Sequence, residues 1–77
     1  MTALKLRRVR IFSNKTAKEA EKLINENLDA FRDNENIEIN YELEIENSTQ
    51  IGSFYDTRYT VVIHEFDVNH VDEYGME

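Results

Sequence analysis

The 77-residue chain contains no cysteine, no proline and no tryptophan, and it has only two glycines. Without cysteine, the chain can form neither a disulfide nor a thiolate site for a metal or for catalysis. Two glycines are too few for a glycine-rich phosphate-binding loop. The apolar runs are a few residues long, whereas a membrane-spanning helix needs about 20 apolar residues in a row. The length of 77 residues indicates one domain with a modest core. Such a chain is only marginally stable alone, which favours self-association.

Basic residues are scarce in the second part of the chain. Residues 1–32 hold eight Lys or Arg and four Asp or Glu, whereas residues 33–77 hold one base, Arg58, and twelve acids, so the net charge is −7. This acidity argues against nonspecific binding to nucleic acid or to an anionic membrane. The basic N-terminal segment lacks the apolar stretch and cleavage site of a signal peptide, so we expect a cytoplasmic protein.

The clearest pattern is the alternation over residues 37–46. Every odd position is large and apolar, and every even position is polar, four of the five being Glu. Because successive side chains of a strand point to opposite faces, this pattern predicts a half-buried strand. A further strand is predicted over residues 54–66, and the intervening residues 47–53 are interpreted as a long turn.

Residues 4–12 predict another strand, but their alternation is interrupted. Leu4 and Leu6 have the opposite parity to Val9 and Ile11. The strand therefore either begins near Arg8 or contains a β-bulge near Arg7 that switches the faces.

A helix is predicted over residues 17–32. Thr16 and Glu19 have the spacing of a capping box, in which each side chain accepts a hydrogen bond from the other residue's backbone N–H, and Asn14 is the rival cap. Apolar residues at three- and four-residue steps form one stripe along this helix. The stripe consists of Ala17, Ala20, Leu23, Ile24, Leu28 and Phe31.

The order strand, helix, strand, strand predicts a two-layer α+β fold with β-α-β-β connectivity. The third strand is the most apolar on both faces, so we expect a three-stranded antiparallel sheet in the order 1-3-2 with the helix on one face. We expect a single domain over residues 1–66 and an acidic, flexible tail over residues 67–77.

This fold leaves one face of the sheet uncovered. We expect Leu6, Val62 and Phe66 to form an apolar contact surface there, with Arg58 and His64 at its rim. The leading hypothesis is a non-enzymatic protein that associates with itself, or with another protein, through this face. The two edge strands carry opposite charges, so pairing of the first strand with the second strand of a neighbouring copy would bring unlike charges together.

An alternative function follows from the acidic row along the second strand. The row consists of Glu38, Glu42, Glu44 and Glu46. Carboxylates two residues apart on a strand are about 6–7 Å from one another. The alternative hypothesis is therefore an acidic decoy or regulator, similar to a DNA mimic, that binds a basic protein surface.

Residues that could carry catalysis or bind a metal do not form a recognised pattern. His64, Glu65, Asp67, His70 and Asp72 could be drawn as a metal cluster, but their spacing matches no known ligand set, and a surface role for His64 is favoured. No serine stands in a nucleophile motif with a base. We therefore expect no catalytic residues, no metal site and no cofactor.

Aromatic side chains offer one further possibility. Phe54 and Tyr55 with Arg58 could stack nucleobases, but the neighbouring row of glutamates argues against nucleic acid as a partner.

The pattern of the chain resembles a family of small sporulation-associated proteins of bacilli, and similar short proteins of Gram-positive phages and mobile elements. The resemblance rests on Val9-Arg10-Ile11-Phe12, on the helix spacing through Ile24-Asn25-Glu26, and on Tyr59-Thr60-Val61-Val62-Ile63. It covers residues 4–66 and implies no catalytic residue. The layout is also similar to dodecin-type flavin-binding oligomers, which keeps a small-ligand-binding oligomer as a second alternative. The absence of a tryptophan to stack on a flavin argues against it.

Overall fold

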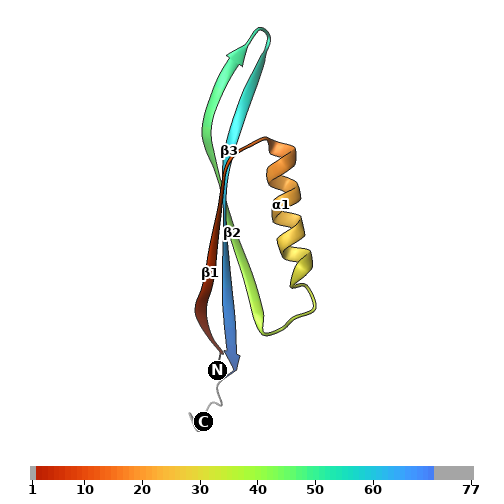
Figure 1. Cartoon of the computed structure of the whole chain (residues 1–77), viewed down its shortest axis with the longest axis vertical. Helices are drawn as coiled ribbons and strands as arrows, with labels where there is room; N and C mark the ends of the chain where they lie inside the picture. The colour runs from red at the N-terminus through yellow and green to blue at the C-terminus, as the bar shows by residue number, and fades with distance from the viewer. Residues whose placement is uncertain (1, 71–77) are drawn as a thin grey trace.

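The computed structural model describes the backbone of residues 2–70 and the side chains of residues 3–68. Its elements are β1 (Thr2–Lys15), α1 (Ala17–Ala30), β2 (Ile37–Ile51) and β3 (Phe54–His70). β3 lies between β1 and β2 and runs antiparallel to both. Figure 1 shows α1 on one face of this sheet. The predicted α+β fold, with β-α-β-β connectivity and strand order 1-3-2, is confirmed.

The molecule is elongated. Its radius of gyration is 17.1 Å, whereas a compact chain of this length would have about 11–12 Å. Figure 1 shows the reason, since the strands are long and α1 lies beside the middle of the sheet. Much of the sheet therefore has no helix against it.

α1 begins at the predicted capping box. The Thr16 Oγ1 accepts a hydrogen bond from the Glu19 N–H at 3.2 Å, and the Glu19 Oε1 accepts one from the Thr16 N–H at 2.9 Å. The bond from the Thr16 backbone N–H is the main cause of a lowered pKa of the Glu19 carboxyl. Asn14 is not the cap, because it lies in β1 with a positive φ of 58°. The helix ends at Ala30, with Phe31 as its C-cap.

The hydrophobic core is small. Ala20 and Ile24 of α1 are buried with Val61 and Ile63 of β3. Half-buried residues of three strands surround this core, and they are Phe12, Ile39 and Tyr59.

The face of α1 toward the sheet differs from the predicted stripe. Asn27 is buried in the same helix, where its Nδ2 donates to the Leu23 carbonyl at 2.8 Å, whereas Leu28 is exposed. The buried residues of α1 are Ala20, Ile24 and Asn27. Leu28 therefore lies beside the contact between the helix and the sheet. Tyr41 belongs to the apolar side of the alternation over residues 37–46 but is also exposed, because α1 contacts β3 more than β2.

A β-bulge interrupts β1 at Arg7. Leu6 lies opposite Phe66, and Arg8 lies opposite Glu65, so Arg7 is the extra residue. Because one extra residue changes the parity of all that follow, Leu6 and Val9 lie on the same face of the sheet. The structure thus selects the bulge over the alternative of a strand beginning at Arg8.

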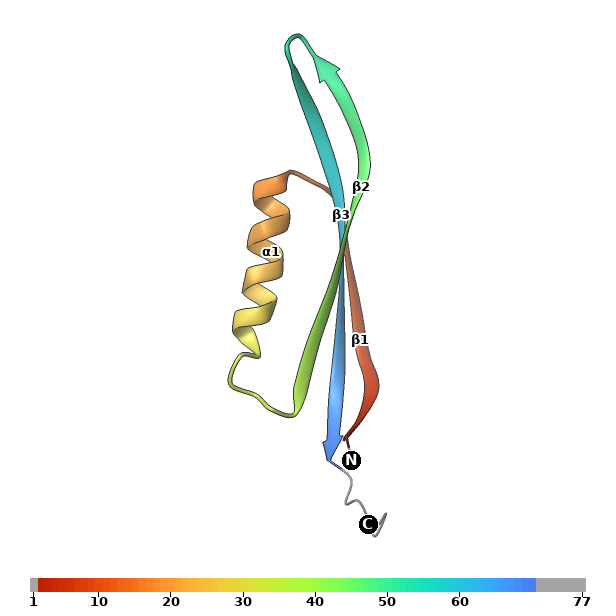
Figure 2. The same cartoon turned by 180° about the vertical axis from the view of Figure 1, so that it is seen from behind.

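The β2–β3 hairpin projects beyond the rest of the fold as a two-stranded arm. β1 stops pairing at Lys15, opposite Tyr59, but β2 and β3 pair onward to Ile51 and Phe54. Figures 1 and 2 show this arm extending past the first turn of α1. The predicted long turn over residues 47–53 is therefore wrong.

The connection between the two strands of the arm is a short turn. The two residues between the strands are Gly52 and Ser53, and Gly52 has a φ of +61°, as the first central residue of a type II′ turn requires. The strand pattern was missed because a register shift after Ile45 breaks the alternation where polar residues begin.

β3 also extends past its predicted end at Phe66. Asp67 pairs with both Lys5 and Ile37, and β3 continues to His70 opposite Thr2. Residues 67–70 are therefore strand, because the alternation of Phe66 and Val68 continues and β1 pairs with all four residues, whereas β2 pairs with Asp67 alone. The remaining part of the predicted acidic tail, residues 71–77, lies outside the described residues.

The cap of α1 predicts the effect of a single substitution. Thr16→Ala removes the hydroxyl that accepts from the Glu19 N–H, and we expect the free energy of unfolding to fall by about 0.5–2 kcal/mol. Thr16→Ser keeps this hydroxyl and should remain close to the parent protein. Urea unfolding at a fixed protein concentration measures both. Equal losses for the two variants would contradict a role for the capping hydroxyl.

Candidate functional site

The face of the sheet away from α1, here called the open face, has an apolar half. Strand register places β1 residues Leu4, Leu6, Val9 and Ile11 opposite β3 residues Val68, Phe66, His64 and Val62 on this face. Figures 1 and 2 show that no element of residues 2–70 lies against it. Seven of these eight positions are apolar, and together we call them the apolar patch. It consists of Leu4, Leu6, Val9, Ile11, Val62, Phe66 and Val68.

The apolar patch is accessible to solvent. Its four β1 residues are all exposed, and Ile11 keeps 66% of its surface. Val62 and Phe66 are half-buried because they lie between β1 and β2, and Val68 is half-buried beside Leu4 of β1. Scattered exposed apolar residues are ordinary, but a contiguous group on a flat sheet is typical of an interaction surface.

The predicted contact residues are brought together, with one exception. Leu6, Val62 and Phe66 lie on the open face, and the His64 ring stacks near the Phe66 ring with centroids 6.2 Å apart. Arg58 lies in the arm, where its Nε forms an ion pair with Asp56 Oδ1 at 3.2 Å. Sequence reasoning missed Val9, Ile11 and Val68, although a bulge at Arg7 would have placed the first two.

The other half of the open face is acidic. Glu38, Asn40, Glu42 and Glu44 of β2 lie opposite Phe66, His64, Val62 and Thr60. Asn40 and Glu42 border, with His64 and Phe66, a shallow hollow of about 300 Å³ at the boundary between the apolar and the acidic half. The predicted acidic row therefore lies beside the apolar patch on the same face.

Glu46 differs from the rest of the acidic row because it joins three strands. Its Oε2 accepts hydrogen bonds from the Thr60 Oγ1 at 2.6 Å and from the Asn14 N–H at 3.0 Å. These two bonds lower the pKa of the Glu46 carboxyl, the Thr60 bond having the larger effect. Glu46 thus holds the end of β1 to the hairpin at the base of the arm.

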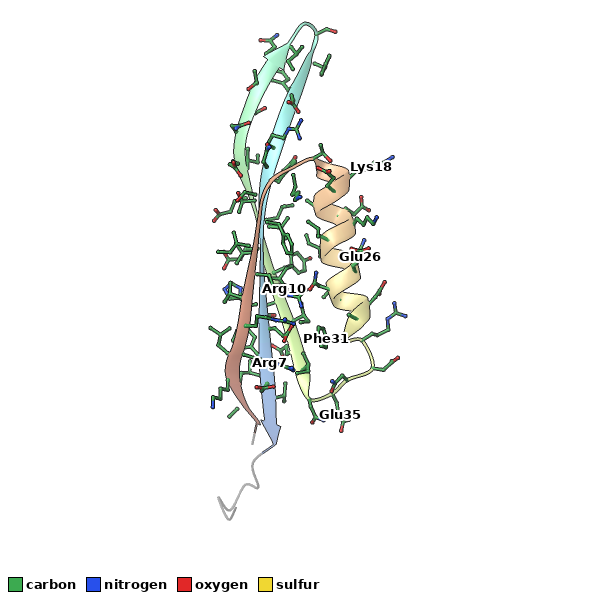
Figure 3. The ribbon with its side chains drawn as sticks, in the orientation of Figure 1. Arg7, Arg10, Lys18, Glu26, Phe31 and Glu35 are labelled. Carbon is green, nitrogen blue, oxygen red and sulfur yellow. The ribbon has the colours of Figure 1, made fainter. Side chains whose placement is uncertain are left out.

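The side of the sheet toward α1 contains a buried acid that the sequence analysis did not identify. Glu65 is 2% exposed, and its Oε1 accepts a hydrogen bond from Arg8 Nη2 at 2.9 Å. The Arg7 Nε lies 3.3 Å from Oε2, which has no hydrogen-bond donor among the described residues, so Arg7 compensates this oxygen through charge. Figure 3 shows Arg7 and Arg10 on the α1 side of the sheet.

The bulge at Arg7 explains how two consecutive arginines reach one carboxylate. Side chains of neighbouring strand residues normally point to opposite faces, but the extra residue lets Arg7 and Arg8 both contact Glu65. The sequence did contain a signal for the burial of Glu65. Glu65 continues the alternation of Tyr59, Val61 and Ile63, so its side chain lies on the same covered face as theirs.

The charges of the two edge strands lie on opposite faces of the sheet. Arg8 and Arg10 share the α1 side with Glu65 and Ile63, whereas Glu42 and Glu44 lie on the open face. If a copy with the same orientation placed its β1 beside β2, the unlike charges would not meet. Such a head-to-tail pairing brings unlike charges together only if the copy is turned over, so that the basic side of its β1 lies beside the acidic row.

Comparison with protein-family models, with curated proteins and with solved structures gave no match. The resemblance to sporulation-associated and phage proteins therefore stays a prediction. Within the described part of the chain, no group of three potential metal ligands comes together, and no helix is long and apolar enough to cross a membrane.

The ion pairs of Glu65 predict a conditional effect of mutation. Replacing Arg7 and Arg8 together by Ala leaves a buried carboxylate without compensation, which we expect to cost about 3 kcal/mol or more of unfolding free energy. Adding Glu65→Leu to the same variant removes the buried charge and should restore most of this loss. Denaturant unfolding compares the three proteins. If Glu65→Leu restores nothing, the arginines stabilise the fold by packing instead.

The lowered pKa of Glu46 predicts a dependence of stability on pH. A carboxyl whose pKa is lower in the folded state stabilises the protein at pH values above 4.5, which is the ordinary pKa of the group. This contribution is lost as the pH falls through the folded-state pKa. Glu46→Gln should therefore melt at a lower temperature than the parent at pH 7, and the difference should shrink below about pH 4. Thermal unfolding at several pH values measures this. Glu44→Gln is the control, and a pH-independent difference for Glu46→Gln would contradict the prediction.

Proposed function

We propose that the protein is a non-enzymatic interaction module that associates with a second copy of itself through the apolar patch of the open face. The observation that carries this proposal is the contiguity of the patch. The bulge at Arg7 aligns four exposed apolar residues of β1 beside three half-buried ones of β3. Burying this patch would remove it from water at about 25 cal/mol for each Å² of apolar surface.

The small core supports the proposal. Four apolar side chains are buried among the described residues, and a single core in a chain of this size gives little stability by itself. Stacking two open faces would add a second apolar layer, at the spacing of about 10 Å that is usual between packed sheets. Self-association would thus stabilise the fold as well as join the copies.

The distribution of charge sets how two open faces can meet. If the patches stack over β1 and β3, the acidic row of each copy lies at the rim, where Glu42 and Glu44 remain hydrated. If the rows were instead stacked on one another, their like charges would repel. His64 would lie inside the contact beside Val9, and Arg58 of the arm would lie at one end.

Two isoleucines give a matched test of this interface. Ile11 on the open face and Ile45 on the α1 side of the sheet are each 66% exposed, and both belong to edge strands. We expect Ile11→Glu to abolish self-association and Ile45→Glu to leave it unchanged. Size-exclusion chromatography with light scattering measures the mass, and circular dichroism checks that each variant is folded.

The outcomes of this test are distinct. A parent protein that remains at 9.1 kDa at all concentrations would reject self-association. An assembly that survives both Ile11→Glu and Val62→Glu would reject the apolar patch as its interface. Loss of assembly on raising the salt concentration would also oppose the proposal, because apolar contacts do not weaken with salt as exposed charge pairs do.

A further inference from the structure

We propose that the free edge of β2 is a second docking site, which accepts an extended segment of another protein with alternating basic and apolar side chains. This site is distinct from the apolar patch. It uses the backbone of β2, the α1 side of the sheet and the acidic row together. The mode is the addition of a strand to a sheet edge, in which backbone hydrogen bonds give affinity and alternate side chains give specificity.

The edge of β2 is regular and unoccupied by other described strands. Within residues 2–70, β2 pairs with β3 alone, and the register from Ile37 to Ile45 runs without interruption. Every β2 residue after Ile39 is exposed. A long edge strand presents unpaired N–H and C=O groups that can pair with another chain.

On the α1 side, this edge borders a groove of about 370 Å³. Its wall on the sheet is formed by Tyr41, Leu43 and Tyr59, whereas its wall on α1 is mixed and consists of Ala17, Glu21, Ile24 and Asn25. Leu43 keeps 49% and Ile45 keeps 66% of its surface exposed. Side chains that an added strand directs to this side would lie next to Tyr41, Leu43 and Ile45 of β2, so they should be apolar.

On the open face, the same edge presents the acidic row. Glu38, Glu42 and Glu44 lie on the same face of β2 within the regular run from Ile37 to Ile45. None of the three forms an ion pair among the described residues. Side chains that an added strand directs to this side should therefore be basic, because unlike charges on neighbouring strands stabilise the pair. The two sides together define an alternating basic and apolar segment.

A second copy of this chain fits the edge less well than another protein does. Antiparallel pairing of β2 with β2 of a copy, with both helices on one side, would place the two acidic rows side by side. β1 has basic and apolar sides, but its edge is interrupted at Arg7 and between Phe12 and Lys15. In addition, Arg7 and Arg8 already contact Glu65. The observations therefore favour a separate, extended segment.

Blocked synthetic peptides test the proposal with the full-length protein. The first peptide alternates lysine and valine over the length of the Ile37–Ile45 run. The second has the same composition with the alternation scrambled, and the third alternates glutamate and valine. We expect the first peptide alone to bind one-to-one by titration calorimetry, and to shift the amide resonances of Ile37–Ile45 in NMR spectra.

Backbone pairing is tested with two further forms of the first peptide. N-methylation of every other residue blocks hydrogen bonding along one edge of the peptide strand and leaves the other edge free. One of the two methylation registers should abolish binding, and the other should preserve it.

Variants of the protein separate this site from the apolar patch. Glu42→Lys with Glu44→Lys should weaken binding of the lysine-valine peptide about tenfold or more, since two attractive cross-strand pairs become repulsive. The control Glu26→Lys with Asp33→Lys has the same change in net charge and should bind normally. Leu43→Glu should also weaken binding of the peptide. Ile11→Glu, the variant that tests self-association, should leave binding of the peptide unchanged.

Several results would overturn the proposal. Equal binding of the scrambled peptide would show attraction to the acidic charge without strand pairing. Shifts confined to the open-face residues of β1 would place the peptide on the apolar patch. Loss of self-association in Leu43→Glu with normal assembly of Ile11→Glu would assign the β2 edge to a second copy of this chain. Failure of the peptides with an intact assembly would reject the β2 site and leave the proposed function standing.

Discussion

The β-bulge at Arg7 is the constraint on which the rest of the structure depends. One extra residue changes the face of every side chain on one side of it. It aligns Leu4 and Leu6 with Val9 and Ile11 on the open face, and it directs Arg7 and Arg8 together toward Glu65. A strand without this bulge would divide its apolar residues between the two faces and leave the buried carboxylate with one partner.

The length of the strands is the second constraint. β2 and β3 are longer than α1, so the helix covers the middle of the sheet and leaves the arm and most of β2 exposed. This shape leaves a small core and exposes much of the sheet to solvent. The β2 edge is exposed because α1 is short and lies closer to β3, and the apolar patch is exposed because no described element lies against the open face.

The elements were largely predictable because their signals are local. The alternation over residues 37–46 and the pair Thr16 and Glu19 depend on neighbours within a few positions, and the structure contains the strand and the capping box that they predict. The predicted half-burial of this strand is limited to Ile37 and Ile39. The predictions failed where the extent of a strand depends on pairing with another strand. The arm extends through polar residues because β2 and β3 support one another across a two-residue turn, and residues 67–70 are strand because β1 pairs with all four of them.

The candidate site could be predicted in part. By itself, the sequence determined the fold class, the strand order, the helix cap and the membership of Leu6, Val62 and Phe66 in an uncovered face. Only the tertiary structure decided that Glu65 is buried between two arginines, that Glu46 joins three strands, and that basic and acidic edge residues lie on opposite faces. The physical reason is register: local patterns determine which residues alternate, but only the pairing of strands distant in sequence determines which side chains meet.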